Sequence, residues 1–402
     1  MLQLFMKNTF TPRMSMQFSH ALGELSGWCV DHNVSWGHLI PTIMTCVSTV
    51  GCESKGLTAV ARIAEYAPSL LKQMELSYIL KHLCHHEKSV QMEAMKAILL
   101  VSVHVEAGNL LRMQSGLPHM VTIMQHLLNS GQEERVCETL EAFISLVESQ
   151  PTFVRPYLTE LGEAMLAIAT CEALEDGTRE LAIEFLLTLS EHAGGMIRKC
   201  HTLLKKLLPL AMSLVASVED DEAWTSRFDH PLTFTEGDAS GISETGASAL
   251  DRMATSLGGT VVLPIVLPFV ELYLNDVGDW RKRRAALYTL CLLGEGCKAS
   301  MTPLLPVIVP QVVKCTTDSH PRVRHAAVHC LGQMADDFGS AKQNFQESFH
   351  GNVLPAFAVL LGNKTVRKKK SLHPSLIIMV LKKLLGNSTH PCISWKCIDE
   401  FL

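Results

Sequence analysis

The chain has 402 residues, of which 47% are hydrophobic, 19% are charged and only 6% are aromatic. Alternating strand and helix signals with glycine-rich loops are missing, which argues against a compact α/β enzyme. The most apolar run, 261–274, contains two prolines and is too short to span a bilayer. Residues 1–18 lack the apolar stretch of a secretory signal. We therefore expect a soluble intracellular protein.

Charge and cysteine usage refine this expectation. Residues 363–402 contain eight Lys or Arg and two Asp or Glu, which leaves 27 basic and 38 acidic residues in 1–362. The body thus carries a net charge of −11, which argues against a nucleic-acid groove and favours a basic protein partner. The thirteen cysteines are scattered through apolar stretches, as expected for buried thiols in a reducing compartment.

Apolar residues recur along the chain at the three- and four-residue spacing of amphipathic helices. Taken in order, the helical segments are 38–49, 57–64, 90–100, 119–128, 136–146, 157–170, 179–189, 202–215 and 264–274. We interpret these segments as pairs of helices. The second helices of successive pairs are separated by roughly 35–50 residues, a spacing typical of HEAT and armadillo arrays. This predicts an all-α, HEAT-repeat superhelical solenoid of about eight helical pairs.

One segment, 219–247, interrupts this periodicity. It is rich in Gly, Ser and Thr and contains eight acidic residues against one basic residue. We predict a long flexible acidic loop between helices, which separates HEAT repeats in 1–218 from HEAT repeats in 248–362. Because the loop combines acids with aromatic side chains, it is also a candidate partner-binding element. Its candidate residues are Asp220, Asp221, Glu222 and Trp224.

The clearest internal repeat pairs 282–294 with 323–335, at an offset of 41 residues. Each copy follows a turn that contains an aspartate, which can cap the coming helix, and Pro321 suits a first helical turn. Arg283 and Arg324 occupy the same position in the two copies. We expect each of them to reach an acid of an adjacent repeat and so join neighbouring units.

Trp280 lies two residues before the first of these copies and is followed by four consecutive basic residues. A tryptophan beside cations can bind a partner peptide or stack on an arginine. It can also simply cover the turn at the start of a helix. Trp280 is therefore retained as a candidate partner-binding residue beside the structural alternative.

Catalytic and metal-binding signatures are absent. The chain contains no phosphate-binding loop, no G-x-S-x-G, no C-x-x-C and no H-E-x-x-H. His325 and His329 lie one helical turn apart, but no third ligand is found at a suitable spacing. We therefore predict neither an enzyme nor a cofactor or metal site, and interpret these histidines as helix-surface residues.

Several segments resemble the importin beta-3 group of karyopherins (importin-five-like receptors). The similar stretches are 247–254 (Ala-Ser-Ala-Leu-Asp-Arg-Met-Ala), 257–259, 263–264, 279–281, 284–287, 294–297, 320–324, 332–335 and 337–338, with looser similarity at 153–158 and 186–191. Family members are far longer, so the resemblance implies a chain truncated at both ends. Residues 363–402 match no repeat and form a divergent basic tail.

The resemblance implies a nuclear import receptor of the karyopherin beta family, shuttling between cytoplasm and nucleus through the nuclear pore. Its partners would be cargo with basic nuclear localisation signals and Phe-Gly nucleoporins, with no nucleic acid or membrane partner. Ran GTPase would release the cargo, although the main Ran contacts of the family lie in repeats that precede this chain. Two alternatives stay open: a HEAT-repeat cytoplasmic scaffold, and a helical-repeat enzyme, against which the acidic body argues.

Overall fold

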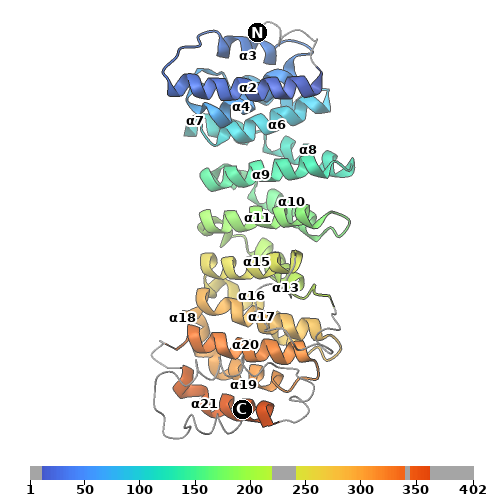
Figure 1. Cartoon of the computed structure of the whole chain (residues 1–402), viewed down its shortest axis with the longest axis vertical. Coiled ribbons are helices and arrows are strands. Elements are labelled where there is room, and N and C mark those ends of the chain that lie inside the picture. The colour runs from blue at the N-terminus through green and yellow to red at the C-terminus, as the bar shows by residue number, and fades with distance from the viewer. Residues whose placement is uncertain (1–10, 220–240, 340–344, 363–402) are drawn as a thin grey trace. The chain divides into compact units, whose positions relative to one another are not determined.

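The computed structural model describes residues 11–219, 241–339 and 345–362, and helices are the regular elements of these ranges (Figure 1). The predicted all-α class is thereby confirmed. Across the described residues, no helix has both the length and the apolar character that a membrane span requires. The chain divides into two compact units, 1–193 and 194–402, which are described in turn.

In the first unit, long helices pack side by side in a row, and shorter elements cover one side of this row. The row consists of α2 (Pro12–Asp31), α4 (Glu53–Tyr66), α6 (Lys88–Ser102), α9 (Glu133–Ser149) and α11 (Asp176–His192). The covering elements are α3 (Leu39–Val47), η1 (Pro68–Gln73), α5 (Ser77–Lys81), η2 (His82–Cys84), α7 (Ala107–Gln114), α8 (Leu117–Asn129), η3 (Pro151–Tyr157) and α10 (Leu158–Thr170).

Within the first unit, α2 is the long helix that the periodicity did not predict. Its start signals are present, because the Thr11 side chain accepts a hydrogen bond from an amide of the first turn and Pro12 follows directly. Two glycines on one face weaken its helical pattern. They serve close packing: a side chain at Gly23 or Gly27 would lie 2.9 Å from atoms of Tyr66 in α4.

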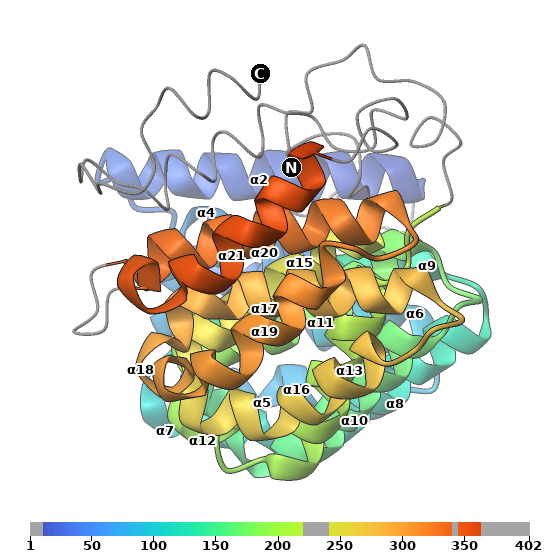
Figure 2. The same ribbon diagram turned by 90° about the horizontal axis from the view of Figure 1, so that it is seen from below.

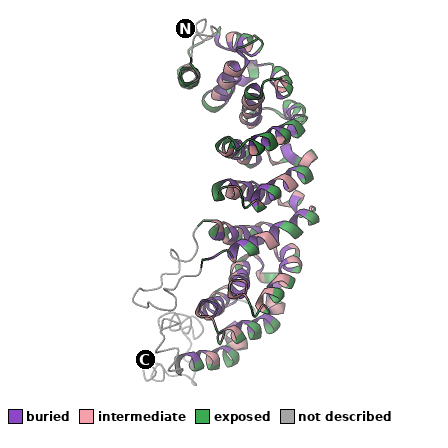
Figure 3. Cartoon of the chain, turned by 90° about the vertical axis from the view of Figure 1, so that its right-hand side faces the viewer, coloured by how far each residue is buried: buried purple, intermediate pink, exposed green. Residues whose placement is uncertain are grey.

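Apolar side chains fill the interior of each helical pair, as the buried faces in Figure 3 show. Polar contacts then join successive pairs at intervals close to one repeat. The Thr58 hydroxyl donates to Glu93, 35 residues later, at 2.9 Å, and the Thr178 hydroxyl donates to Glu133, 45 residues earlier, at 2.9 Å. Each helical pair thus buries its apolar surface against the neighbouring pairs, as repeat arrays do.

The second unit repeats this arrangement. Its row of long helices is α15 (Ile242–Leu257), α17 (Trp280–Gly296) and α20 (Pro321–Asp337). The covering elements are α12 (Gly194–Ile197), α13 (His201–Val215), α16 (Gly259–Leu274), α18 (Lys298–Met301), η4 (Thr302–Leu304), α19 (Leu305–Cys315) and α21 (Phe345–Gly362). Figure 2 shows α13 and α16 lying together on one side of α17, with which both are in contact.

Helix α15 begins at Ile242, so residues 242–247 of the predicted acidic loop belong to a helix. The sequence misled here because this first turn is rich in residues of low helix propensity, including Gly246. That glycine is required by packing, since a side chain would lie 2.7 Å from the carbonyl oxygen of Ala211 in α13. Residues 220–240 and the predicted basic tail, 363–402, lie outside the described residues.

The predicted arginine contacts between repeats are confirmed for one arginine of the two. Arg283 is buried and donates two hydrogen bonds to the Asp318 carboxylate, at 2.7 and 2.9 Å, which joins α17 to the turn before α20. Arg324 instead donates to the carbonyl oxygens of Asp318 and Ser319, at 2.8 and 2.9 Å, and so ties down the turn of its own repeat. The expected capping is also seen, because Asp279 accepts a hydrogen bond from an amide of α17.

Candidate functional site

Acidic side chains from the three long helices of the second unit form what we call the acidic row. Its members are Asp251 of α15, Glu295 of α17, and Asp336 and Asp337 of α20. Three of the four are exposed and Asp337 is half-buried. The helices that carry them pack side by side in the order α15, α17, α20. Consecutive repeats therefore present carboxylates to solvent from neighbouring helices.

The electrostatics of the acidic row show that its charges are close enough to repel each other. Partial burial and, next, the charge of Glu295 raise the pKa of Asp251. Burial likewise raises the pKa of Asp337, with further increases from Glu295 and Asp336, against a hydrogen bond from Gln333 and the charge of Lys298. Repulsion of this kind is relieved when a cationic group binds, because an opposite charge favours the ionised carboxylates.

Sequence reasoning did not single out the acidic row. A signal for it was present, because the 41-residue offset of the clearest repeat places Glu295 opposite Asp336. Asp337 also leaves a trace: Gly294 carries no side chain because the carboxylate of Asp337 lies against it. What the repeat alone could not give is the alignment of α15 with α17, which depends on packing.

Trp280 lies at the start of α17 in a stack of aromatic and cationic groups. Its ring is parallel to that of His320, with 4.0 Å between ring centroids and 6° between ring planes. The guanidinium carbons of Arg281 and Arg322 lie 4.8 and 5.4 Å from the Trp280 ring centroid. The ring of Trp280 thus stacks on a histidine and lies beside two arginines at the start of a helix. A role for Trp280 in binding a partner stays a prediction.

The two arginines of this stack bind the chain just after α13. Arg281 Nε donates to the Val218 carbonyl oxygen at 2.8 Å, and Arg322 Nη1 donates to the Glu219 carbonyl oxygen at 2.7 Å. The candidate residues Asp220, Asp221, Glu222 and Trp224 follow directly in the sequence but lie outside the described residues. The structure does not test their predicted role in partner binding, which stays a prediction.

The paired histidines of α20 have different surroundings, neither of them typical of a metal site. His325 is buried, contrary to the surface position expected from the sequence, and burial together with the charge of Arg284 lowers its pKa to about 4. His329 Nδ1 lies 3.4 Å from the Cys291 sulfur. In the described part of the chain, no three potential metal-ligating side chains gather.

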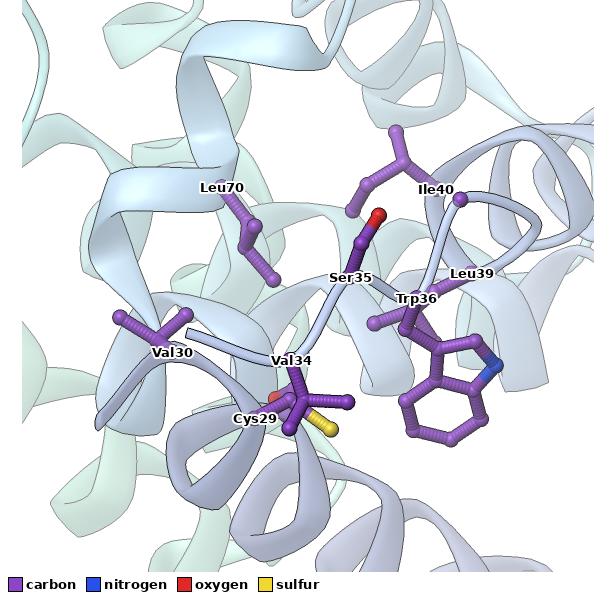
Figure 4. Close-up of a pocket in the computed structure, with 10 residues that line it drawn as sticks. Cys29, Val30, Val34, Ser35, Trp36, Leu39, Ile40 and Leu70 are labelled. Atoms are coloured by element: carbon purple, nitrogen blue, oxygen red, sulfur yellow. The ribbon is translucent and has the colours of Figure 1, made fainter. Parts of the chain in front are cut away.

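A small pocket opens in the first unit where the loop after α2 meets α3 and η1 (Figure 4). Its volume is about 140 Å³, and its walls include apolar side chains of all three elements. The labelled lining residues are Cys29, Val30, Val34, Ser35, Trp36, Leu39, Ile40 and Leu70. Binding sites for drug-sized molecules measure roughly 300–1,000 Å³, so this pocket has room for one side chain and not for a cofactor.

Three family models match the chain in succession. A model of IPO5-like TPR repeats matches residues 11–164, an importin-repeat model matches 171–264, and a model of HEAT-like repeats matches 280–334. Importin subunit beta-3 of Saccharomyces cerevisiae is 27% identical over 244 residues, and human importin-4 is 26% identical over 253 residues. The homologues of this chain are importin-family karyopherins. This confirms the resemblance and the HEAT-type fold that the sequence predicted.

Solved structures agree on the fold. The structure titled as Kap121p bound to Pho4p has a TM-score of 0.75 at 19% identity over 95% of this chain, and Kap121p bound to RanGTP has a TM-score of 0.74 at 20% identity over all of it. In both comparisons this chain covers 39% of the Kap121p chain. The importin homologues are transport receptors rather than enzymes. The matched residues make up 60–61% of this chain and 22% of each of the two relatives.

Proposed function

We propose that this chain is part of a nuclear import receptor that shuttles between cytoplasm and nucleus and binds basic cargo on the acidic row. The observation that carries the proposal is the group of carboxylates from three successive repeats, in which burial and, to a smaller extent, the charge of Glu295 raise the pKa of Asp251 and of Asp337. Basic side chains of a localisation signal would lower this repulsion. The Kap121p structures, whose titles name bound partners such as Pho4p and RanGTP, support a receptor role.

Neutralising the acidic row should weaken binding of a basic peptide roughly tenfold to hundredfold at low salt, because each exposed charge pair contributes up to about 1 kcal/mol. The variant is D251N/E295Q/D336N/D337N, and the readout is fluorescence anisotropy with a labelled lysine-rich peptide. Binding should fall as salt rises. On acidification, binding should weaken at a higher pH than expected for ordinary carboxylates, because raised pKa values let Asp251 and Asp337 take up protons at a higher pH.

A charge-matched control separates the acidic row from net charge. It neutralises four exposed glutamates of the first unit: Glu141, Glu148, Glu160 and Glu172. This control should keep most of the wild-type affinity at physiological ionic strength, where distant charges are screened. Equal losses in both variants would show that the peptide responds to overall charge alone. The scaffold alternative would gain if the wild-type protein ignored basic peptides altogether.

The second partner class, Phe-Gly nucleoporins, is assigned to the pocket beside α3. One phenylalanine side chain suits its size, and Val34, one of the lining residues, is 46% exposed. Burial of one phenylalanine contributes about 1.5–3 kcal/mol. A structure titled as Kap121p bound to Nup53p, with a TM-score of 0.74 at 20% identity, has the same fold.

Replacing Ser35 with phenylalanine should fill this pocket from its own rim, because Ser35 lies between Ile40 and Leu70 in Figure 4. We expect affinity for a Phe-Gly repeat peptide to fall at least tenfold, measured by isothermal titration calorimetry. Val50→Phe is the control, since Val50 is 91% exposed and does not line the pocket. If S35F and V50F bind the peptide equally well, the pocket is not the Phe-Gly site.

A further inference from the structure

Two arginines from different helical pairs bind adjacent carbonyl groups of one stretch of chain. Arg281 belongs to α17 and holds Val218, 63 residues earlier; Arg322 belongs to α20 and holds Glu219, 103 residues earlier. Arg284 of α17 also directs its guanidinium at the Val215 carbonyl oxygen, at 3.4 Å. The end of α13 leaves backbone carbonyls without helical partners, and guanidinium groups satisfy such carbonyls well.

The contact made by Arg322 is unusual for a repeat array, in which each pair normally touches only its neighbours. Helix α13 packs on α15, and α17 lies between α15 and α20 in the row. The bond from Arg322 to Glu219 therefore passes over the repeat that contains α17. Arg322 is only 4% exposed, so the donor of this charged hydrogen bond is largely removed from water.

Trp280 lies beside both arginines. Both guanidinium groups lie near its ring, and the ring itself is stacked on His320, which precedes α20. The flat indole thus links the start of α17 to the start of α20. Trp280, Arg281 and Arg322 together contact both of these helices and the end of α13.

We propose that Trp280, Arg281 and Arg322 act as positioning residues that clamp α13, α15, α17 and α20 into one block and thereby hold the acidic row at fixed spacing. The inference rests on the proposed function of the row. Every member of the row is carried by α15, α17 or α20, all of which lie inside the clamped block. A preorganised set of carboxylates binds a cationic peptide more tightly because less order has to be imposed on binding.

Arg322→Gln tests the clamp, and Arg324→Gln is its matched control. Both substitutions remove one positive charge from the start of α20, but Arg324 binds carbonyl oxygens of its own turn only. R322Q should raise the hydrogen-exchange rates of the backbone amides of 212–219 roughly tenfold to hundredfold, as expected for the loss of a charged hydrogen bond. R324Q should leave these amides at the wild-type rate.

Binding of the lysine-rich peptide provides the second readout. Removing a positive charge should by itself strengthen binding of a cation, so a three- to tenfold loss in R322Q, without a loss in R324Q, identifies positioning. Unchanged exchange at 212–219 in R322Q would overturn the clamp. Accelerated exchange with equal peptide affinity in both variants would overturn its positioning role. A wild-type protein that binds no basic peptide would overturn the proposed function and the positioning role, while exchange still tests the clamp.

Discussion

Replacing Arg283 with alanine is expected to lower the free energy of unfolding by about 3–5 kcal/mol. The reason is that the substitution leaves the Asp318 carboxylate without its charge partner in a poorly hydrated position. Arg283 is only 7% exposed, and its two bonds to Asp318 measure 2.7 and 2.9 Å. Its Nη1 atom also holds the carbonyl oxygens of Asp276 and Val277. Chemical denaturation followed by circular dichroism measures the change.

The neighbouring pair of Lys282 and Asp276 is the control for this prediction. Their charged atoms also approach to 2.8 Å, but both side chains are about a third exposed or more. Exposed ion pairs contribute little to stability because both charges stay hydrated, so Lys282→Ala should have a small effect. Comparable losses in R283A and K282A would contradict the view that the buried pair joins α17 to the next repeat.

Acidification is expected to destabilise the protein through His325, by about 3 kcal/mol in total. In the folded protein the pKa of His325 is about 4, against about 6.5 in the unfolded chain. Above pH 6.5 both states hold the ring neutral, and this contribution is complete. As the pH falls from 6.5 to 4, the His325 ring binds a proton in the unfolded state but stays neutral in the folded state. Stability then declines and levels off below about pH 4.

The measurement compares pH profiles of unfolding free energy for the wild-type protein and His325→Leu. The leucine variant should lose the slope between pH 6.5 and 4, whatever its stability at neutral pH, because its buried side chain cannot titrate. His86→Gln is the control, since His86 is exposed, and it should keep the slope. Parallel profiles in the wild-type and H325L proteins would show that another group is responsible.

The repeat pattern predicted most long helices because their apolar residues recur at helical spacing on one face. It did not place α2, α15, α19 or α21. At α2 and at the start of α15, Gly23, Gly27 and Gly246 weaken the pattern. At each of these positions a neighbouring helix lies too close for a side chain. Such approaches depend on tertiary packing, which one sequence does not reveal.

The candidate site was less predictable than the fold. An acidic body was evident from composition, but its carboxylates acquire a common location only when α15, α17 and α20 are placed side by side. The bond between Arg283 and Asp318 was predictable because it joins two copies of a recognisable repeat. The bond between Arg322 and Glu219 was not, because it links positions 103 residues apart that share no repeat position.

The anchoring of the chain after α13 also bears on how this protein can evolve. Arginines fix Val218 and Glu219 on one side of 220–240, and on the other side Gly241, with φ of +61°, leads directly into α15. The ends of this stretch are thus set by the surrounding repeats, independently of the residues between them. A change in the number of residues between these two fixed ends therefore leaves both anchors in place, and the helical pairs on both sides can keep their register.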